Sequence, residues 1–295
     1  MKAVSLKIGG VPEHFNLPWR LAIEQGLFAS QEIALTWQDF PGGTGAMTKA
    51  LRAQEIDLAV VLTEGIVADI IRGNAAKILK VYVKSPLTWG IYAHHTSSIQ
   101  QLSQISHSRY AISRFGSGSH LMAYVHALQQ GWPPEQLTFV PLKDLQQMRE
   151  GLAAGEADVF LWEKVTTQPY VANGELRLIG ECITPWPCFL LVVRTEVWEQ
   201  YPATIQQIAT LINHFCQNFQ QQPSISHRIA ERYKLDIEEV NPWLQQTVWA
   251  TDNQLSISML ENVVSTLASL QIVQAPVDIQ DLIVHFPENN LIFEA

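Results

Sequence analysis

The first eighty residues alternate short apolar runs with amphipathic segments. The apolar runs have the length and composition of buried strands and fall at 4–8, 33–37, 57–62 and 77–83. Helical patterns follow Pro18, the glycine-rich turn at 41–45 and Thr63. A repeated strand-helix-strand order of this kind predicts a mostly parallel sheet with helices on both of its faces.

A second unit of the same kind begins after the segment 85–90. Its apolar runs predict strands at 110–114, 137–141, 158–162 and 176–179. Between them, one predicted helix ends near Leu128 and another covers 142–152. A strongly apolar strand at 190–193 comes next, and from Pro202 the pattern is helical almost to the end of the chain.

Two segments rich in proline and tryptophan, 85–90 and 184–189, bracket the middle unit. If the chain crosses between two lobes at both, the strand after the second crossing rejoins the first sheet. The sequence therefore predicts a two-lobed α/β protein, each lobe a mainly parallel sheet flanked by helices, with a hinge between them. Lobe one covers 1–86 and 190–295 and includes the helical tail, and lobe two is an insertion of 87–189. This is the architecture of the type 2 periplasmic-binding-protein fold, and 295 residues suit two domains.

The composition narrows the expected partners. The formal net charge is -9, no Lys/Arg-rich run interrupts it, and no nucleic-acid-binding motif occurs, so nucleic acid is not expected. The three cysteines, Cys182, Cys188 and Cys216, have neither the number nor the spacing of a disulfide framework or a metal site. Neither a Rossmann fingerprint nor a P-loop is present, and the spacing of the histidines is not diagnostic of a metal site, so neither a cofactor nor a metal is expected.

The chain also carries information about its location. No apolar window of about 18 or more residues occurs, so direct membrane insertion is not expected. The N-terminus alternates apolar and polar residues and contains Lys2 and Lys7, which is typical of a first strand and not of a secretory signal. We therefore expect a cytoplasmic protein, which is periplasmic only if a signal was removed.

Several phrases of the sequence carry a family resemblance. They are GVPEHFNLPW at 10–19, EQGLF at 24–28, IAL at 33–35, PGGTG at 41–45 and AQEIDLA at 53–59. This series resembles the nitrate, sulfonate and taurine substrate-binding family of ABC importers, which also contains the fungal thiamine-pyrimidine synthases. In that family an E-x-G-x-F helix follows the first strand, and a G-x-x-D-x-A phrase follows the second. Gln54 stands here where that phrase has its glycine.

Two further segments, SRFGSGSHLM at 113–122 and WPCF at 186–189, resemble a cytosolic subgroup from bacteria and fungi that shares the fold. The resemblance covers nearly the whole chain. It implies a small-molecule ligand in the cleft between the lobes. It also implies the membrane component of an ABC transporter as a further candidate partner.

Ligands of open α/β sheets bind beyond the carboxyl ends of the strands, and every candidate segment lies at such an end. The strongest is 113–120, where small residues let the backbone approach a ligand and helix-start N–H groups attract an anion. Its candidate ligand residues are Arg114, Gly116, Ser117, Gly118, Ser119 and His120. Arg114 is suited to a bidentate contact with a carboxylate, sulfonate or phosphate. The alternative is a plain turn with a serine N-cap and a solvated arginine.

The other candidate ligand residues are Glu13, His14, Gly43, Thr44, Glu64, Trp89, Trp162, Glu163 and Trp186. The Gly43-Thr44 turn faces the cleft by the same argument, unless it merely needs positive φ. Glu64 and Glu163, one from each lobe, suit an amine or simply favour the start of a helix. The tryptophans stack on a planar ring or pack in the core, and His14 is a ligand or a structural histidine.

Three functions compete. The first, which we expect, is a binding protein without catalytic residues that closes around a small anionic or zwitterionic molecule. The second is an enzyme related to thiamine-pyrimidine synthesis, acting on a small heterocyclic or phosphorylated compound. The resemblance implies a cysteine-rich motif for that activity, and here only Cys188 lies in a comparable segment. The third, a regulatory effector domain, ranks last because no helix-turn-helix segment precedes the first strand.

Overall fold

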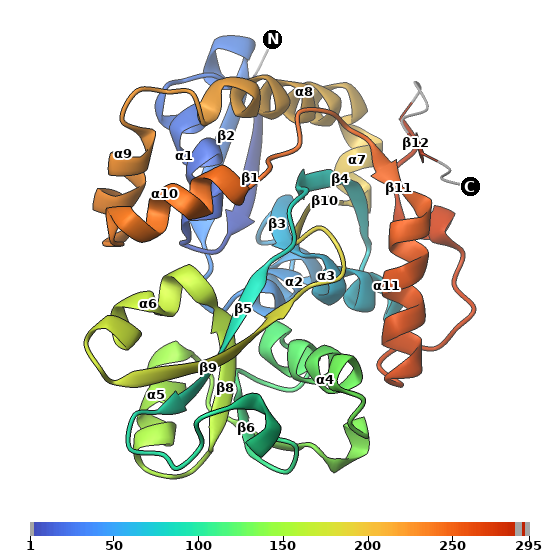
Figure 1. Ribbon diagram of the computed structural model, residues 1–295. Coiled ribbons are helices and arrows are strands. Elements are labelled where there is room, and N and C mark those ends of the chain that lie inside the picture. Colours follow the sequence, from blue (N-terminus) through green and yellow to red (C-terminus); the bar gives the residue numbers. More distant parts are fainter. Residues whose placement is uncertain (1–2, 287–290, 293–295) are drawn as a thin grey trace.

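Each lobe of the protein is built on a five-stranded sheet (Figure 1). The computed structural model describes residues 3–286 and 291–292. The sheet of lobe one has the order β2-β1-β3-β10-β4, formed by β1 Val4–Gly10, β2 Ile33–Asp39, β3 Leu58–Leu62, β4 Ala76–Val83 and β10 Phe189–Arg194. The sheet of lobe two has the order β7-β6-β8-β5-β9, formed by β5 Thr88–His94, β6 Arg109–Ile112, β7 Thr138–Pro141, β8 Val159–Glu163 and β9 Leu176–Ile183.

In each sheet one strand opposes the direction of the others. β1 is parallel to β2 and β3, whereas β10 is antiparallel to both β3 and β4. In the second sheet β6 is parallel to β7 and β8, whereas β5 is antiparallel to β8 and β9. The opposing strand is in both cases the one that the chain enters directly from the other lobe. The predicted mainly parallel α/β fold with two lobes is confirmed.

The chain crosses between the sheets twice, and the two crossing segments, 84–87 and 184–188, pair with each other. The Leu87 N–H donates to Thr184 Oγ1 (2.8 Å), and the Thr184 N–H donates to the Leu87 carbonyl (3.1 Å). Further along, the Cys188 N–H donates to the Ser85 carbonyl (3.2 Å). β10 then enters the first sheet between β3 and β4, although all of lobe two precedes it in the sequence.

The lobe boundaries 1–86, 87–189 and 190–295 stay a prediction. Their terminal portions 1–2, 287–290 and 293–295 lie outside the described residues.

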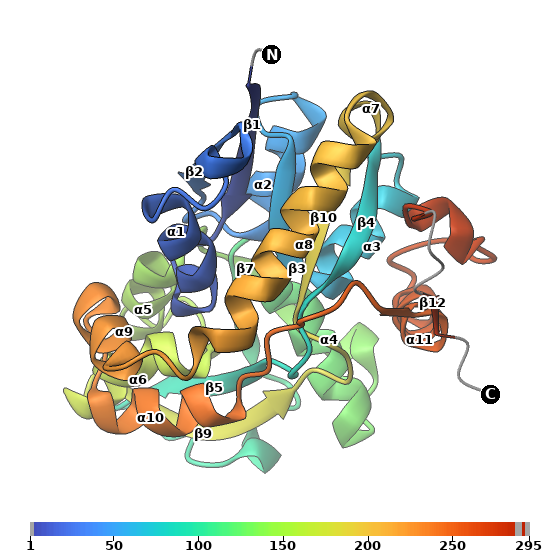
Figure 2. The ribbon, with the colours of Figure 1, turned by 90° about the horizontal axis from the view of Figure 1, so that it is seen from above.

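Helices cover both faces of each sheet, as the strand-helix alternation predicts. In lobe one α1 lies on one face and α2 and α3 on the other (Figure 2). In lobe two α4 lies on one face and α5 and α6 on the other (Figure 1). The bounds are α1 Leu17–Glu24, α2 Thr44–Arg52, α3 Thr63–Ile71, α4 Gly118–Gln130, α5 Leu145–Ala153 and α6 Lys164–Ala172.

The helical tail packs mainly on lobe one. It consists of α7 Thr195–Gln200, α8 Pro202–Phe219, α9 Ile225–Tyr233, α10 Ile237–Gln246 and α11 Ile257–Ser269, with the short parallel pair β11 Leu255–Ser256 and β12 Leu291–Ile292. α8 runs along the first sheet next to α1, and α11 lies beside α3 (Figure 2). α10 reaches lobe two, where Gln168 of α6 donates to Glu239 (3.1 Å). None of the helices in the described part of the chain is both long and apolar enough to cross a membrane.

The predicted elements did not include β5, α6, α7 and the short strands β11 and β12. β5 lies in a stretch that proline and tryptophan marked as a crossing, and α6 contains Pro169, which disturbs a helical pattern. Gln54, at the place of a family glycine, follows α2 with φ 58°, in the left-handed region. Glycine is favoured after a helix because it enters that region without a Cβ clash.

β10 lies at the centre of the first core. Its residues Leu190, Leu191, Val192 and Val193 are completely buried, since helices cover both faces of the sheet. A strand buried on both faces reads as a continuous apolar run, which is why 190–193 was recognisable in the sequence.

We expect Leu191→Ala to lower the free energy of unfolding by about 2–5 kcal/mol, because it leaves a cavity in a closed core. Urea denaturation measures this loss. Leu128→Ala is the matched control, because that side chain is 42% exposed. We expect the control to change stability by about 0.5 kcal/mol or less. Equal losses in the two variants would contradict the central position of β10.

Candidate functional site

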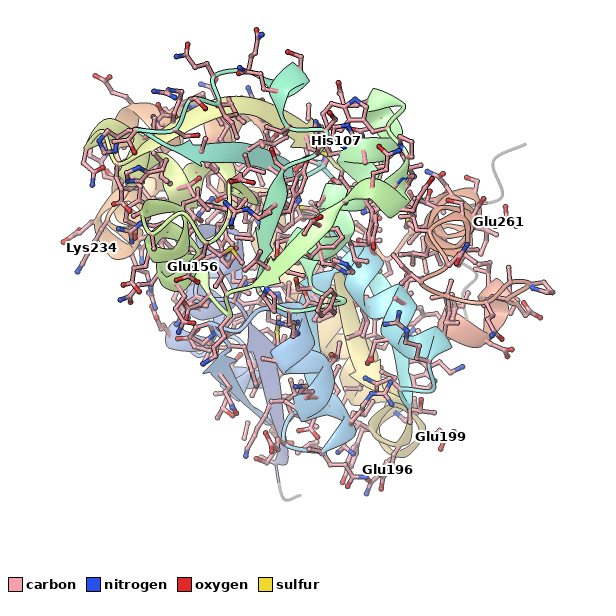
Figure 3. The ribbon with its side chains drawn as sticks, turned by 90° about the horizontal axis from the view of Figure 1, so that it is seen from below. His107, Glu156, Glu196, Glu199, Lys234 and Glu261 are labelled. Atoms are coloured by element: carbon pink, nitrogen blue, oxygen red, sulfur yellow. The ribbon has the colours of Figure 1, made fainter. Side chains whose placement is uncertain are left out.

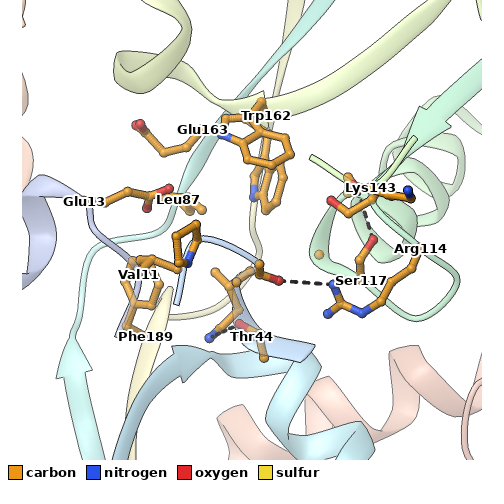
Figure 4. Close-up of a pocket in the computed structure, with 18 residues that line it drawn as sticks. Val11, Glu13, Thr44, Leu87, Arg114, Ser117, Lys143, Trp162, Glu163 and Phe189 are labelled. Atoms are coloured by element: carbon orange, nitrogen blue, oxygen red, sulfur yellow. Dashed lines mark hydrogen bonds between the residues drawn. The ribbon is translucent and has the colours of Figure 1, made fainter. Parts of the chain in front are cut away.

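A cavity lies between the lobes, where six strands present their carboxyl ends (Figure 4). Lobe one contributes the segments after β1 and β2 and the last residue of β3. Lobe two contributes the segments after β6 and β7 and the last two residues of β8. The crossing segments add Leu87, and Trp89 and Phe189 come from the strands that follow them. Both sheets therefore aim their loops at the same space, as open α/β sheets do around a ligand.

Ten of the predicted ligand residues line this cavity: Glu13, Gly43, Thr44, Trp89, Arg114, Ser117, Gly118, Ser119, Trp162 and Glu163. The cavity thus brings together the glycine-rich turn of lobe one and the serine-rich turn of lobe two. Contact of these residues with a ligand stays a prediction.

The start of α4 forms one wall of the cavity. Ser117 caps the helix, and its Oγ accepts from the His120 N–H (3.4 Å). The Ser119 hydroxyl accepts from the Ser113 N–H (3.1 Å). A Cβ on Gly118 would come within 2.7 Å of Leu62 and 3.0 Å of Trp89, so only glycine lets this helix approach lobe one so closely.

Arg114 reaches across the cleft. Its Nη1 donates to the carbonyl of Gly42 in lobe one (3.2 Å), and a Cβ on Gly45 would overlap its guanidinium. Desolvation lowers the pKa of Arg114 from its ordinary value, although the group remains a cation at neutral pH. The side chain is partly buried in the interlobe space, so the alternative of a freely solvated arginine does not hold.

The turn of lobe one is tied to the end of β3 through Thr44. The Thr44 hydroxyl does not cap α2; it accepts from the Leu62 N–H (3.0 Å) and so ties the turn to the end of β3. Gly43 is the residue before the helix and has φ 67°, which explains the glycine at this position.

An acidic side and a basic side face each other in the cavity (Figure 4). Glu13 and Glu163 lie on one side, and Arg114 and Lys143 lie on the other. Burial raises the pKa of Glu13 to about 8, and the negative charge of Glu163 adds to this effect. Glu13 therefore holds a proton at neutral pH when no cation lies beside it.

The remaining lining residues were not among the predicted ligand residues: Val11, Pro41, Gly42, Leu62, Leu87, Ser113, Lys143 and Phe189. Gly42 and Ser113 belong to segments that the sequence did single out. Lys143 has a recognisable signal, because it follows the strand β7 and therefore lies at a carboxyl end. The segment after β7 is therefore selected by the same argument as the other loops, namely its position at the carboxyl end of a strand.

Five predicted ligand residues lie outside the lining of this cavity. His14 packs its ring against Phe15 (4.7 Å between centroids) and Trp243 (4.1 Å), and burial lowers its pKa. The Gly116 N–H donates to Nδ1 of His120 (3.0 Å). Both imidazoles are buried and neither lines this cavity, so contact of either histidine with a ligand stays a prediction.

The ring of His120 lies among aromatic neighbours, Tyr124 (4.8 Å) and Phe139 (4.5 Å). Burial lowers the pKa of His120 to about 4, so the imidazole is neutral at neutral pH and brings no charge to an anion.

Glu64 and Trp186 form a buried pair beside the second crossing segment. The Trp186 Nε1–H donates to Glu64 Oε2 (2.9 Å), and both side chains are buried. Burial raises the pKa of Glu64 to about 7. The predicted acidic partner of Glu163 is therefore not Glu64, because α3 directs that carboxyl to the crossing segment; Glu13 takes the place in the cavity.

Cys188, in the segment WPCF at 186–189, is not activated as a nucleophile. Burial raises the pKa of Cys188 well above its usual range, and the charge of Glu64 raises it further. A protonated thiol is a weak nucleophile. Within residues 3–286 and 291–292, no group of three or more His, Cys, Asp or Glu side chains is placed to hold a metal ion.

We expect Glu64→Gln to stabilise the protein above pH 7 by up to about 3 kcal/mol. The folded state holds the Glu64 proton up to about pH 7, whereas the unfolded chain releases it near its ordinary pKa of 4.5. Between pH 4.5 and about pH 7, the free energy of unfolding of the wild type therefore falls relative to that of the variant. Below pH 4.5 the difference between the two proteins is constant. Chemical denaturation at a series of pH values measures this. The exposed Glu156→Gln is the control, and a pH-independent difference for Glu64→Gln would contradict the assignment.

Comparisons with known proteins agree with this architecture. Residues 89–182 match the family model described as Ca3427-like PBP, a periplasmic-binding-protein family. The Candida albicans CA3427 gene product, described as defining a new family with the generic periplasmic binding protein fold, superposes with a TM-score of 0.89. It is 24% identical, and the match covers 99% of this chain and 98% of that one.

Two sulfonate-binding proteins share the same fold. The alkanesulfonate-binding protein SsuA from Xanthomonas axonopodis pv. citri, bound to MOPS, has a TM-score of 0.78 at 16% identity, with 93% of this chain and 96% of that chain covered. The periplasmic aliphatic sulphonate binding protein SsuA from Escherichia coli has a TM-score of 0.70 at 15% identity, with 99% and 96% covered. No curated protein sequence matches the chain. The chain is a protein of the type 2 periplasmic-binding-protein fold, and its residues 89–182 match the Ca3427-like proteins of that fold.

Proposed function

We propose that the protein binds a small anionic or zwitterionic molecule in the interlobe cavity and closes its two lobes around it. The observation that carries this proposal is the lining of the cavity, which both lobes supply from the carboxyl ends of their strands. Arg114 spans the same space from one lobe to a backbone carbonyl of the other. A ligand at this place contacts both lobes at once and therefore favours the closed arrangement.

The polar groups of the cavity favour an anion at its basic side. Arg114 and Lys143 supply positive charge, and the start of α4 supplies serine hydroxyls and the dipole of a 13-residue helix. The sulfonate-binding relatives are consistent with a sulfonate or a similar oxyanion, which is the chemical class we propose first.

A binding role is favoured over the enzyme alternative. The three cysteines are buried, and the pKa of each is raised, so none is a ready nucleophile. The similar solved structures named above are described by their fold or as binding proteins.

The cellular setting is a separate proposal. We propose a cytoplasmic protein that carries or senses its ligand, with a periplasmic protein that delivers its ligand to an ABC-transporter membrane component as the alternative. Fractionation of cells that express the natural gene distinguishes the two.

We expect a small molecule to co-purify with the protein, and mass spectrometry of the denatured sample identifies it. Small-angle scattering of ligand-stripped protein should then show a smaller radius of gyration when that molecule is returned, because the lobes close. A small molecule of unrelated charge is the control. An unchanged scattering profile would count against closure.

We expect Arg114→Ala to weaken the binding of a sulfonate, with MOPS as the probe, by about tenfold or more, because a charged hydrogen-bonding group is lost. Isothermal titration calorimetry measures the affinity. Arg228→Ala, on the exposed face of α9, removes the same charge far from the cavity and should leave the affinity unchanged. Equal affinities for wild type and Arg114→Ala would remove Arg114 from the site.

A further inference from the structure

The two acidic residues of the cavity come from opposite lobes. Glu13 lies in the loop after β1, and Glu163 is the last residue of β8. Both line the cavity on the side opposite Arg114 and Lys143 (Figure 4). Burial raises the pKa of Glu13, and the charge of Glu163, which lines the same cavity, adds to this effect.

Glu163 is held in place as a carboxylate. Its oxygens accept from the Val165 N–H (3.0 Å), the Thr166 N–H (2.7 Å) and the Thr166 hydroxyl (2.6 Å), all at the start of α6. A carboxylate offers about four lone-pair positions, so one remains for a further donor. The negative charge is therefore fixed in position and still able to bind.

Glu13 has no such support. No hydrogen bond from a described residue supports its carboxyl, and the residue is only partly exposed. The titratable groups around it bring no compensating charge: burial lowers the pKa of His14 and raises that of Tyr233 to about 12, so both are neutral at pH 7. Among the described residues, neither of these two neighbours places a positive charge beside Glu13.

The charged side chains near Glu163 already have partners of their own. Lys164 pairs with Glu181 (2.8 Å), and Glu239 of α10 accepts from Gln168 (3.1 Å). Neither supplies a positive charge to the Glu13–Glu163 space.

An independent observation also points to a ligand. Trp89 lines the same cavity and is only 6% exposed, yet its indole N–H has no hydrogen-bond partner among the described residues. A buried donor of this kind usually has an acceptor. The residues that line the cavity thus include a tryptophan whose indole N–H has no partner among the described residues, together with two carboxyl groups.

We propose that the cavity is a site for a zwitterion whose cationic nitrogen lies between Glu13 and Glu163 and whose anionic group lies toward Arg114 and Lys143. The proposal rests on the function proposed above and extends it, because it assigns a charge to each end of the ligand and makes Glu13 a specificity-determining residue. A nitrogen held in this way contacts both lobes, so it contributes to closure. It also replaces the proton of Glu13, which leaves as the ligand binds.

The experiment compares ligands that differ only in the amine. The probes are 2-aminoethanesulfonate and 3-aminopropanesulfonate, with ethanesulfonate and 1-propanesulfonate as their counterparts. Calorimetry of the full chain at pH 7, in two buffers of different ionisation enthalpy, gives both affinity and proton release. We expect at least one amine-bearing sulfonate to bind about tenfold or more tightly than its counterpart. We also expect its binding to release up to about one proton, because Glu13 ionises beside the ammonium group.

The matched variants isolate the acidic side. Glu13→Gln should abolish both the preference for the amine and the proton release, because the carboxyl that pairs with the ammonium group is lost. Glu199→Gln is the control, because this exposed glutamate lies at the end of lobe one far from the cleft (Figure 3). It should behave as wild type in both measurements.

The outcomes separate this inference from the broader function. Equal affinity for the two members of every pair, or no binding of either amine-bearing probe, overturns the zwitterion site. A preference for the amine that survives in Glu13→Gln overturns the role of Glu13. A co-purifying anion without a basic nitrogen also overturns the inference, yet leaves the proposed binding function standing. Absence of both a bound molecule and lobe closure in the earlier experiments contradicts the function itself.

Discussion

The paired crossing of the chain is the constraint on which the rest of the structure depends. Residues 84–87 and 184–188 run between the lobes side by side and hydrogen-bond to each other at both ends of the crossing. The buried pair of Glu64 and Trp186 anchors the second crossing to α3. Two short strands of backbone therefore connect two separately formed sheets, and the lobes face each other across a limited space. This arrangement permits hinge motion and forbids large displacement.

The crossing also decides where chemistry can occur. The strand that enters each sheet from the other lobe, β10 or β5, is antiparallel to its neighbours. The other strands of each sheet all run in one direction. Their carboxyl ends then face the cleft from both sides. Glycines make the close approach possible: Gly118 leaves no room for a Cβ beside Leu62, and Gly45 leaves space for the Arg114 guanidinium.

The charges of the cavity follow from the same geometry. Lobe one contributes Glu13, and lobe two contributes Glu163, Arg114 and Lys143. Burial makes an isolated carboxyl costly to ionise, so Glu13 keeps its proton at neutral pH. Trp89 and Trp162 line the same cavity as these charged groups.

The sequence by itself determined the fold class, most of the elements and the loops that meet at the cleft. The periodicity of apolar residues indicates which side of an element is buried. Because ligands of open α/β sheets bind beyond the carboxyl ends of the strands, the predicted strands also indicate where the site lies. Only the tertiary structure decided which titratable groups share the cavity. Sequence order places Glu64 and Glu13 equally near a strand end, but packing turns Glu64 toward Trp186 and leaves Glu13 facing Glu163. Side-chain direction depends on contacts between segments far apart in the chain, and local patterns do not contain that information.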